Sequence, residues 1–143
     1  MRIHLLLADS AQADPTGKVH ALGIGWTVTS TPTPPAALIA MIWVEWHEAN
    51  QKFNLTGSLV DGDGKEIDVD GPDGFGPIKF EGVIEAGRPP GLPAGTDQMM
   101  PLVVNLGPGL KLTPGHRYEW RVRIDTAPNP TIGVAGFLIR PNS

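Results

Sequence analysis

Apolar and polar residues alternate strictly in the segment that follows the Pro114-Gly115 turn, near the end of the chain. The apolar positions are Tyr118, Trp120, Val122 and Ile124, and the polar positions between them are Glu119, Arg121 and Arg123. A period of two is typical of a strand that turns one face to the core and the other to water. The pattern therefore predicts a half-buried strand of an antiparallel sheet.

The same kind of pattern, interrupted by segments rich in Gly and Pro, predicts nine strands and no helix. The expected strands are Arg2–Ala8, Lys18–Thr29, Ala37–Trp46, Lys52–Asp61, Lys65–Val69, Pro77–Ala86, Gln98–Leu106, His116–Asp125 and Thr131–Arg140. The fourth and fifth of these are expected to form a hairpin around Asp61-Gly-Asp-Gly64. Because no linker divides the chain, we expect one all-β domain over residues 1–143, an antiparallel sandwich.

The segment Ala37–Trp46 is apolar on both of its faces. Leu38, Ala40, Ile42, Val44 and Trp46 are expected on one face, and Ile39, Met41 and Trp43 on the other. A strand of this kind must be covered twice, so the second cover has to be a loop, a terminus or another subunit. If the chain does not cover Ile39, Met41 and Trp43 itself, they form an apolar patch that implies a partner.

Composition narrows the class of protein. The chain has 143 residues, 41 % hydrophobic and 18 % charged, with 18 Gly and 15 Pro, which suits short strands joined by turns. The net charge of -4 gives no electrostatic reason to expect nucleic acid or an anionic membrane as a partner. With no Cys, disulfides and thiolate catalysis are excluded. The short apolar run before Asp9 matches neither a signal peptide nor a membrane span, so a cytoplasmic product is expected.

Sequence motifs for chemistry are few. The four His residues do not stand at metal-ligand spacing, and no nucleophile elbow or phosphate-binding loop occurs, so neither an enzyme nor a cofactor is expected. The segment from 61 to 73 holds six acids and one Lys, and Asp61, Asp63, Asp68 and Asp70 are candidate Ca²⁺ ligands. An EF-hand loop is excluded because Lys65 and Pro72 stand at ligand positions. A solvated hairpin turn is the simpler interpretation.

Two further sets of residues are candidate binding surfaces. Trp43 and His47 could form an aromatic platform on which a sugar ring stacks. Arg117, Arg121 and Arg123 share the solvent face of the alternating strand, in a region with five bases against two acids. That face is either simply hydrated or meets an acidic surface on a neighbouring copy.

Two parts of the sequence resemble known protein families. The spacing Leu112-x-Pro-x-x-x-Tyr118 resembles the tyrosine corner of immunoglobulin-like and fibronectin-type-III-like sandwiches. It implies an immunoglobulin-like sandwich of about seven to nine strands whose Tyr hydroxyl bonds to upstream backbone. The segments 4–26, 31–38, 70–74, 87–95 and 114–120 are similar to a family of small uncharacterised proteins from actinobacteria and their phages. That resemblance implies no activity, and a phage connection favours a role in the virion.

The sequence thus predicts a non-enzymatic structural or interaction module. Its most specific form is a capsid-associated accessory protein of the decoration type, located in the cytoplasm when made or in the virion. It would assemble through a sheet face, with further copies or a capsid protein as partner. The alternative is a carbohydrate- or Ca²⁺-binding β-sandwich module.

Overall fold

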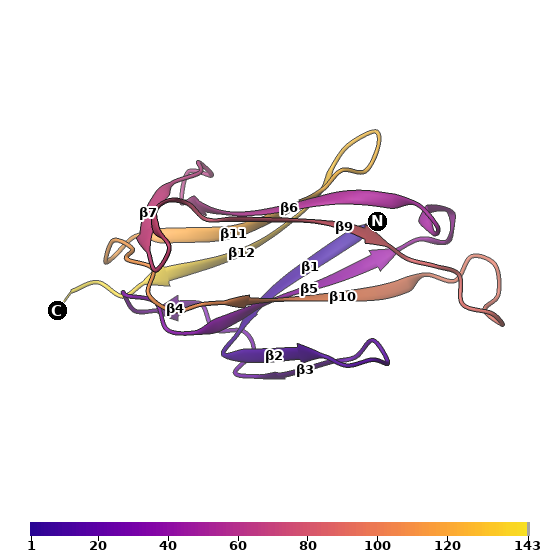
Figure 1. Ribbon diagram of the computed structural model, residues 1–143, viewed down its shortest axis with the longest axis horizontal. Coiled ribbons are helices and arrows are strands. Elements are labelled where there is room, and N and C mark those ends of the chain that lie inside the picture. The colour runs from indigo at the N-terminus through magenta and orange to yellow at the C-terminus, as the bar shows by residue number, and fades with distance from the viewer. Residues whose placement is uncertain (143) are drawn as a thin grey trace.

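The computed structural model describes residues 1–142, which form two stacked sheets, two smaller hairpins and one 3₁₀ turn (Figure 1). The three-stranded sheet has the order β1 (Arg2–Ala8), β5 (Ala36–Val44), β10 (Gln98–Leu106). The five-stranded sheet has the order β4 (Val28–Thr29), β12 (Thr131–Ile139), β11 (Arg117–Ile124), β6 (Lys52–Asp61), β9 (Lys79–Glu85). The hairpins are β2 (Ser10–Ala13) with β3 (Val19–Leu22), and β7 (Asp68–Gly71) with β8 (Gly74–Pro77). The 3₁₀ turn η1 spans Trp46–Glu48. No helix within residues 1–142 is long and apolar enough to cross a membrane.

The core lies between the two sheets, where the inward faces of the alternating strands meet. β5 contributes Leu38 and Ile42, and β11 contributes Trp120, Val122 and Ile124, all at most 3 % exposed. The predicted all-β sandwich is therefore confirmed. The described residues contain twelve strands instead of nine, and the immunoglobulin-like subclass stays a prediction.

The expected continuous strand Lys18–Thr29 is wrong, because two glycines break it. Gly23 and Gly25 have φ of 66° and 91°, left-handed values that end an extended strand. At Gly23 the side chain of Asp9 occupies the space that a Cβ would need. The first half of the segment becomes β3, which pairs with β2, and the second half becomes β4, which pairs in parallel with the end of β12.

The expected pairing of Lys65–Val69 with β6 is also wrong. The turn itself forms, since Gly64 N–H donates to Asp61 O at 3.0 Å, but only the isolated bridge between Val60 and Glu66 follows it. The chain then leaves β6 and builds the β7–β8 hairpin. β9 takes the neighbouring position instead, pairing with β6 along seven residues.

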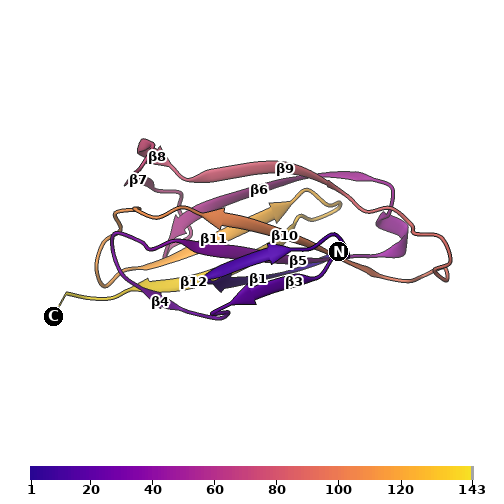
Figure 2. The same cartoon turned by 60° about the horizontal axis from the view of Figure 1, so that its bottom comes forward.

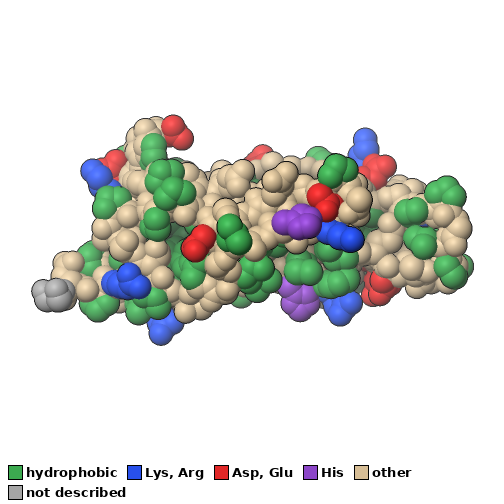
Figure 3. Space-filling model, turned by 90° about the horizontal axis from the view of Figure 1, so that it is seen from below, with side chains coloured by type: hydrophobic (Ala, Val, Ile, Leu, Met, Phe, Trp, Pro, Cys, Tyr) green, Lys and Arg blue, Asp and Glu red, His purple; other side chains and the backbone are tan. Residues whose placement is uncertain are grey.

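The second apolar face of β5 is covered in part by the chain itself, with Ile39 buried and Met41 and Trp43 half-buried. The β2–β3 hairpin folds back over β5 and β10 as a third layer, seen below the three-stranded sheet in Figure 1. Its residues alternate between small apolar and mostly polar side chains, so one face suits the sheet and the other suits water. Figure 3 looks onto this side of the molecule, where hydrophobic side chains show among polar ones.

The two sheets close against each other on one side only. β1 packs on β12 so closely that a Cβ added to Gly133 would lie 2.9 Å from Ile3 Cγ2. On the opposite side, β9 and β10 are the outer strands of their sheets, and within residues 1–142 they make no comparable contact (Figure 2). We call this region, bounded by β9, β10 and the β7–β8 hairpin, the open side of the sandwich.

Candidate functional site: the open side of the sandwich

An apolar cleft lies in the open side, between the inner faces of β9 and β10. Its volume is about 270 Å³, and the turn Gly71–Gly74 of the β7–β8 hairpin forms one lip. The walls and floor are mainly hydrophobic, formed by Ile78, Phe80, Val104, Leu106, Leu110 and Trp120. Asn105, Lys79 and Asp73 also line the cleft. A concave apolar space with few polar groups is the usual form of a binding site.

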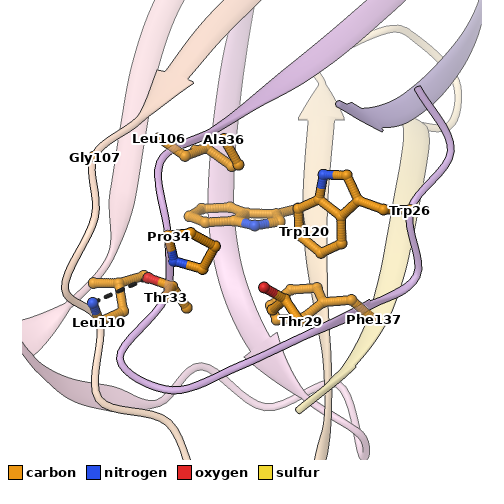
Figure 4. A pocket seen from close by; sticks show the side chains of 10 residues that line it. All are labelled: Trp26, Thr29, Thr33, Pro34, Ala36, Leu106, Gly107, Leu110, Trp120 and Phe137. Atoms are coloured by element: carbon orange, nitrogen blue, oxygen red, sulfur yellow. Dashed lines mark hydrogen bonds between the residues drawn. The ribbon is translucent and has the colours of Figure 1, made fainter. Parts of the chain in front are cut away.

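A second, smaller cavity adjoins the cleft and shares Leu106, Leu110 and Trp120 with it. Figure 4 shows the Trp120 ring close to Pro34 and Trp26 in this cavity. At the same end of the sandwich, Thr33 accepts a hydrogen bond from Leu110 N–H at 3.0 Å. The volume of this cavity is about 20 Å³. That is room for about one water molecule, so the larger cleft is the one that can hold a ligand group.

β10 leaves a row of core residues partly exposed, and the last two of them, Val104 and Leu106, line the cleft. Met100, Leu102, Val104 and Leu106 all pack against the core, yet none of them is fully buried. The cause is the separation of β9 from β10, which within residues 1–142 make no contact comparable to that of β1 with β12. A half-exposed apolar row of this length is rarer on a monomer than scattered single residues.

Both free edges beside the cleft resist pairing with another strand. Pro101 pairs with Met41 of β5, and a Pro in a sheet is tolerated where its missing N–H would point away from the ladder. The free edge of β10 therefore lacks a donor at its middle. β9 carries Lys79, Glu81 and Glu85, and charges of this kind protect an edge strand. Contacts at the open side must come from side chains rather than from added strands.

One wall of the cleft depends on a glycine. Gly57 of β6 pairs with Phe80 of β9, and the Phe80 ring lies where a Gly57 Cβ would be. The ring can lie flat on β6 only because that residue has no side chain. Phe80 also packs on Trp120 with ring centroids 6.5 Å apart, so the wall and floor are a single aromatic surface.

Two lysines stand at the rim of the cleft. Lys79 Nζ donates to Glu66 at 2.8 Å, and this hydrogen bond with the nearby Glu66 charge raises the pKa of Lys79. Lys111 Nζ lies 3.4 Å from Asp70 of the hairpin. Both lysine side chains stay substantially exposed, 42 % and 68 %. At this rim each lysine is thus paired with an acid of its own molecule, and its side chain remains accessible to water.

The expected interface residues Ile39, Met41 and Trp43 differ in burial. Ile39 is 1 % exposed in β5, the strand that β2 contacts, so it offers no surface to a partner in this structure. Met41 and Trp43 lie further along β5 and are half-buried. The Arg2 guanidinium carbon stands 5.5 Å from the centroid of the Trp43 ring and occupies part of its surroundings.

The expected sugar platform of Trp43 and His47 is divided between two elements. β5 ends at Val44, so Trp43 belongs to the strand while His47 belongs to η1. Trp46, expected on the core face with Val44, is half-buried in η1 instead. The Arg88 guanidinium lies 4.4 Å from its ring centroid and donates to Trp46 O.

The same turn brings together the only His, Asp and Glu side chains within residues 1–142 that could share a metal ion. They are Glu45, His47 and Glu48, whose ligating atoms lie within 4.8 Å of one another. Glu48 is already satisfied, because its carboxylate accepts from Glu45 N–H at 3.0 Å and lies 3.0 Å from the Met1 amino group. This cluster acts as a cap of the turn.

The expected Ca²⁺ ligands Asp61, Asp63, Asp68 and Asp70 are not gathered within the described residues. Asp61 Oδ1 accepts from the N–H groups of Asp63 and Lys65 at 2.9 and 3.0 Å, which holds the hairpin turn. These bonds, led by that from Lys65, keep the pKa of Asp61 below its ordinary value. Asp70 faces Lys111 instead. The geometry matches the hairpin interpretation.

The same turn occurs a second time at the tip of the β2–β3 hairpin. Asp14-Pro-Thr-Gly17-Lys18 repeats the pattern Asp-x-x-Gly-Lys of residues 61–65, and Asp14 Oδ1 accepts from Thr16 and Lys18 N–H. His20 Nε2 lies 2.7 Å from the other carboxylate oxygen. The pKa of Asp14 is far below its ordinary value, because of the hydrogen bond from the Thr16 side chain first and that from His20 second.

The expected arginine face is present on β11, and two of its three arginines pair with acids nearby in the sequence. Arg121 pairs with Glu119 at 3.2 Å, and Arg123 pairs with Asp125 at 3.0 Å. Arg117 is exposed at the start of the strand. The idea that this face meets an acidic surface of another copy stays a prediction. On the inner face, the Tyr118 hydroxyl accepts from Thr113 N–H at 2.9 Å.

Sequence reasoning missed the most exposed aromatic residue of the molecule. Phe75 is 75 % exposed on β8, beside the lip of the cleft. Its neighbours Gly74 and Gly76 are a local signal, because a lone aromatic between glycines has no adjacent side chains to pack on. The local sequence of β10 contains no comparable signal that its core residues would be partly exposed.

Comparison with known proteins gives one family. A model described as "Family of unknown function (DUF6941)" matches residues 4–132. No curated protein matches the chain.

Proposed function

We propose that this chain, which belongs to the DUF6941 family of unknown function, is a non-enzymatic interaction module that associates with copies of itself through the open side. The observation that carries the proposal is the row of half-exposed core residues on β10 beside a cleft of about 270 Å³. Burying such a row in a subunit contact stabilises the contact by removing apolar surface from water.

The size of this surface favours a protein over a small ligand. Nine residues of β10 extend over roughly 30 Å, which is longer than a small molecule that would fit the cleft. The proposal moves the assembly surface from the sheet face, expected at Ile39, to the sheet edges.

The separation of the cleft from the cluster of acids and His within residues 1–142 supports a non-enzymatic role. The cleft lies near Leu106, which pairs with Ala36 at the start of β5. The cluster of Glu45, His47 and Glu48 follows the other end of β5. The two features therefore stand at opposite ends of one nine-residue strand and cannot serve one reaction.

Sedimentation velocity over a concentration series tests the proposal, with amide hydrogen exchange measured at the lowest and highest concentrations. We expect association, with added protection in β9 and β10. The control is the closed side, where amides of β1 and β12 should show no change between concentrations. A chain that stays monomeric, or one whose protection appears only on the closed side, contradicts the proposal. A capsid protein as partner stays a prediction from the sequence.

A further inference from the structure

The β7–β8 hairpin carries an apolar side chain that is largely exposed to water. It projects past the sheets at one end of the molecule (Figure 2), and Phe75 on β8 is 75 % exposed. In the hairpin Phe75 pairs with Asp70, and Gly71 pairs with Gly74 across the turn. An exposed phenyl ring on a protruding hairpin is a typical anchor for a protein contact.

The cleft of the open side is a suitable receptor for such a ring. A cavity of roughly 150 Å³ lined by aliphatic and aromatic side chains binds benzene, and this cleft has about 270 Å³. Phe80 and Trp120 would supply aromatic contacts to the ring, and Leu106 and Leu110 aliphatic ones.

Anchor and receptor lie next to each other on one molecule. The turn Gly71–Gly74 forms the lip of the cleft, and Phe75 is the next residue. When an anchor and its receptor lie next to each other on one surface, a two-fold axis through that surface brings the anchor of each copy to the receptor of the other. Strand addition is disfavoured by Pro101 and the charges of β9, so side-chain exchange is the mode that the surface permits.

Charge also matches a second copy. The hairpin carries Asp68, Asp70 and Asp73 and no base. The rim outside the hairpin carries Lys79 and Lys111, both substantially exposed beside their acidic neighbours. An incoming hairpin brings its acids within reach of these lysines, each of which already pairs with one acid of its own molecule, so the charges orient an encounter rather than supply its affinity.

We infer that two copies associate by reciprocal exchange of Phe75, the β7–β8 hairpin of each copy placing its ring in the apolar cleft of the other. The inference rests on the proposed self-association and names its contact. Two copies could associate through the open side by other side chains, so this contact can be wrong while the self-association holds.

Two single variants remove the two halves of the contact. Phe75→Ser removes the anchor, and folding should be unaffected because Phe75 is exposed. Gly107→Leu blocks the receptor: Gly107 lines the cleft, and a Cβ there meets no atom within 4 Å. Val83→Thr is the matched control, since Val83 is an exposed apolar residue of β9 outside the cleft.

Sedimentation velocity gives the dissociation constant of each variant. We expect that Phe75→Ser and Gly107→Leu each weaken association roughly tenfold or more, while Val83→Thr leaves it unchanged. A 1:1 mixture of the two weakened variants should recover mixed pairs, because one copy supplies a ring and the other an open cleft.

The remaining outcomes overturn the inference in distinguishable ways. If both variants associate as tightly as the natural chain and β9 and β10 remain protected, the exchange is wrong and the self-association stands. If the mixture recovers no mixed pairs, reciprocal exchange is wrong. If the natural chain is a monomer at every concentration, both proposals fail. Binding of free benzene by that monomer would assign the cleft to a small apolar ligand.

Discussion

Substituting Gly133 with Ala should destabilise the protein, because the sandwich is closed at that point. The added Cβ would lie 2.9 Å from Ile3 Cγ2 and 3.1 Å from Leu5 Cγ, both in the packed strand β1. Overpacking of this kind costs about 1–3 kcal/mol. Ala also restricts the unfolded chain, which contributes about 0.4–1 kcal/mol in the opposite direction. The steric cost is the larger, so the free energy of unfolding should fall by about 1–2 kcal/mol.

Gly82→Ala is the matched control on the open side. Gly82 lies in β9, it is exposed, and a Cβ there meets no atom within 4 Å. Only the effect on the unfolded chain remains, so stability should rise by about 0.4–1 kcal/mol. The assay is guanidinium denaturation followed by Trp fluorescence, at a protein concentration where the chain is monomeric. The reasoning is refuted if Gly133→Ala is as stable as the natural chain, or if the two variants shift stability in the same direction.

Three single contacts give further predictions. Tyr118→Phe removes the hydroxyl that accepts a backbone N–H, so urea denaturation should show a loss of about 0.5–1.5 kcal/mol; unchanged stability would mean that the bond contributes nothing. Millimolar Ca²⁺ should leave the melting temperature unchanged, because Asp61 Oδ1 is committed to its own turn, and a saturable rise would restore the Ca²⁺ interpretation. The folded pKa of Asp14 is lowered, so its turn should be fully stabilised above the ordinary carboxyl pKa of about 3.9 and loosen as pH falls below it. NMR shifts of the Lys18 amide should follow that titration and lose it in Asp14→Asn; a titration that persists in the variant contradicts the assignment.

The strands with clear alternation could be read from the sequence alone. β1, β6, β10, β11 and β12 lie within a residue or so of their expected bounds. Alternation is a local property, since it states which side of an extended chain is compatible with water. The core positions of Tyr118 and Trp120 follow from the same property, and both are at most 5 % exposed.

The pairing partners of the short segments could not be read in this way. Residues 65–69 and 79–85 both follow β6 and both have strand-like sequences, and only the second pairs with it along its length. Local pattern does not rank two candidate neighbours of one strand, because the choice depends on which arrangement buries more of the whole chain.

The exposure of the residues at the candidate site could not be predicted from the sequence either. Ile39 and Leu102 both stand in apolar strands, yet the first is buried and the second is half-exposed. The difference has two causes. The β2–β3 hairpin packs on one face of β5, whereas β9 does not pack closely on β10. The side-chain pattern of a strand says that a face is apolar, and other parts of the chain decide whether that face is covered.

The sequence by itself determined that this protein is a β-sandwich, where most of its strands run and which face of each turns inward. Those properties depend on neighbours within a few residues, which the pattern of the chain records directly. The tertiary structure alone decided that the sandwich closes at Gly133 and stays open beside Phe75. Closure requires contact between segments more than a hundred residues apart, and the free energy of that contact depends on shape and packing that no local pattern contains.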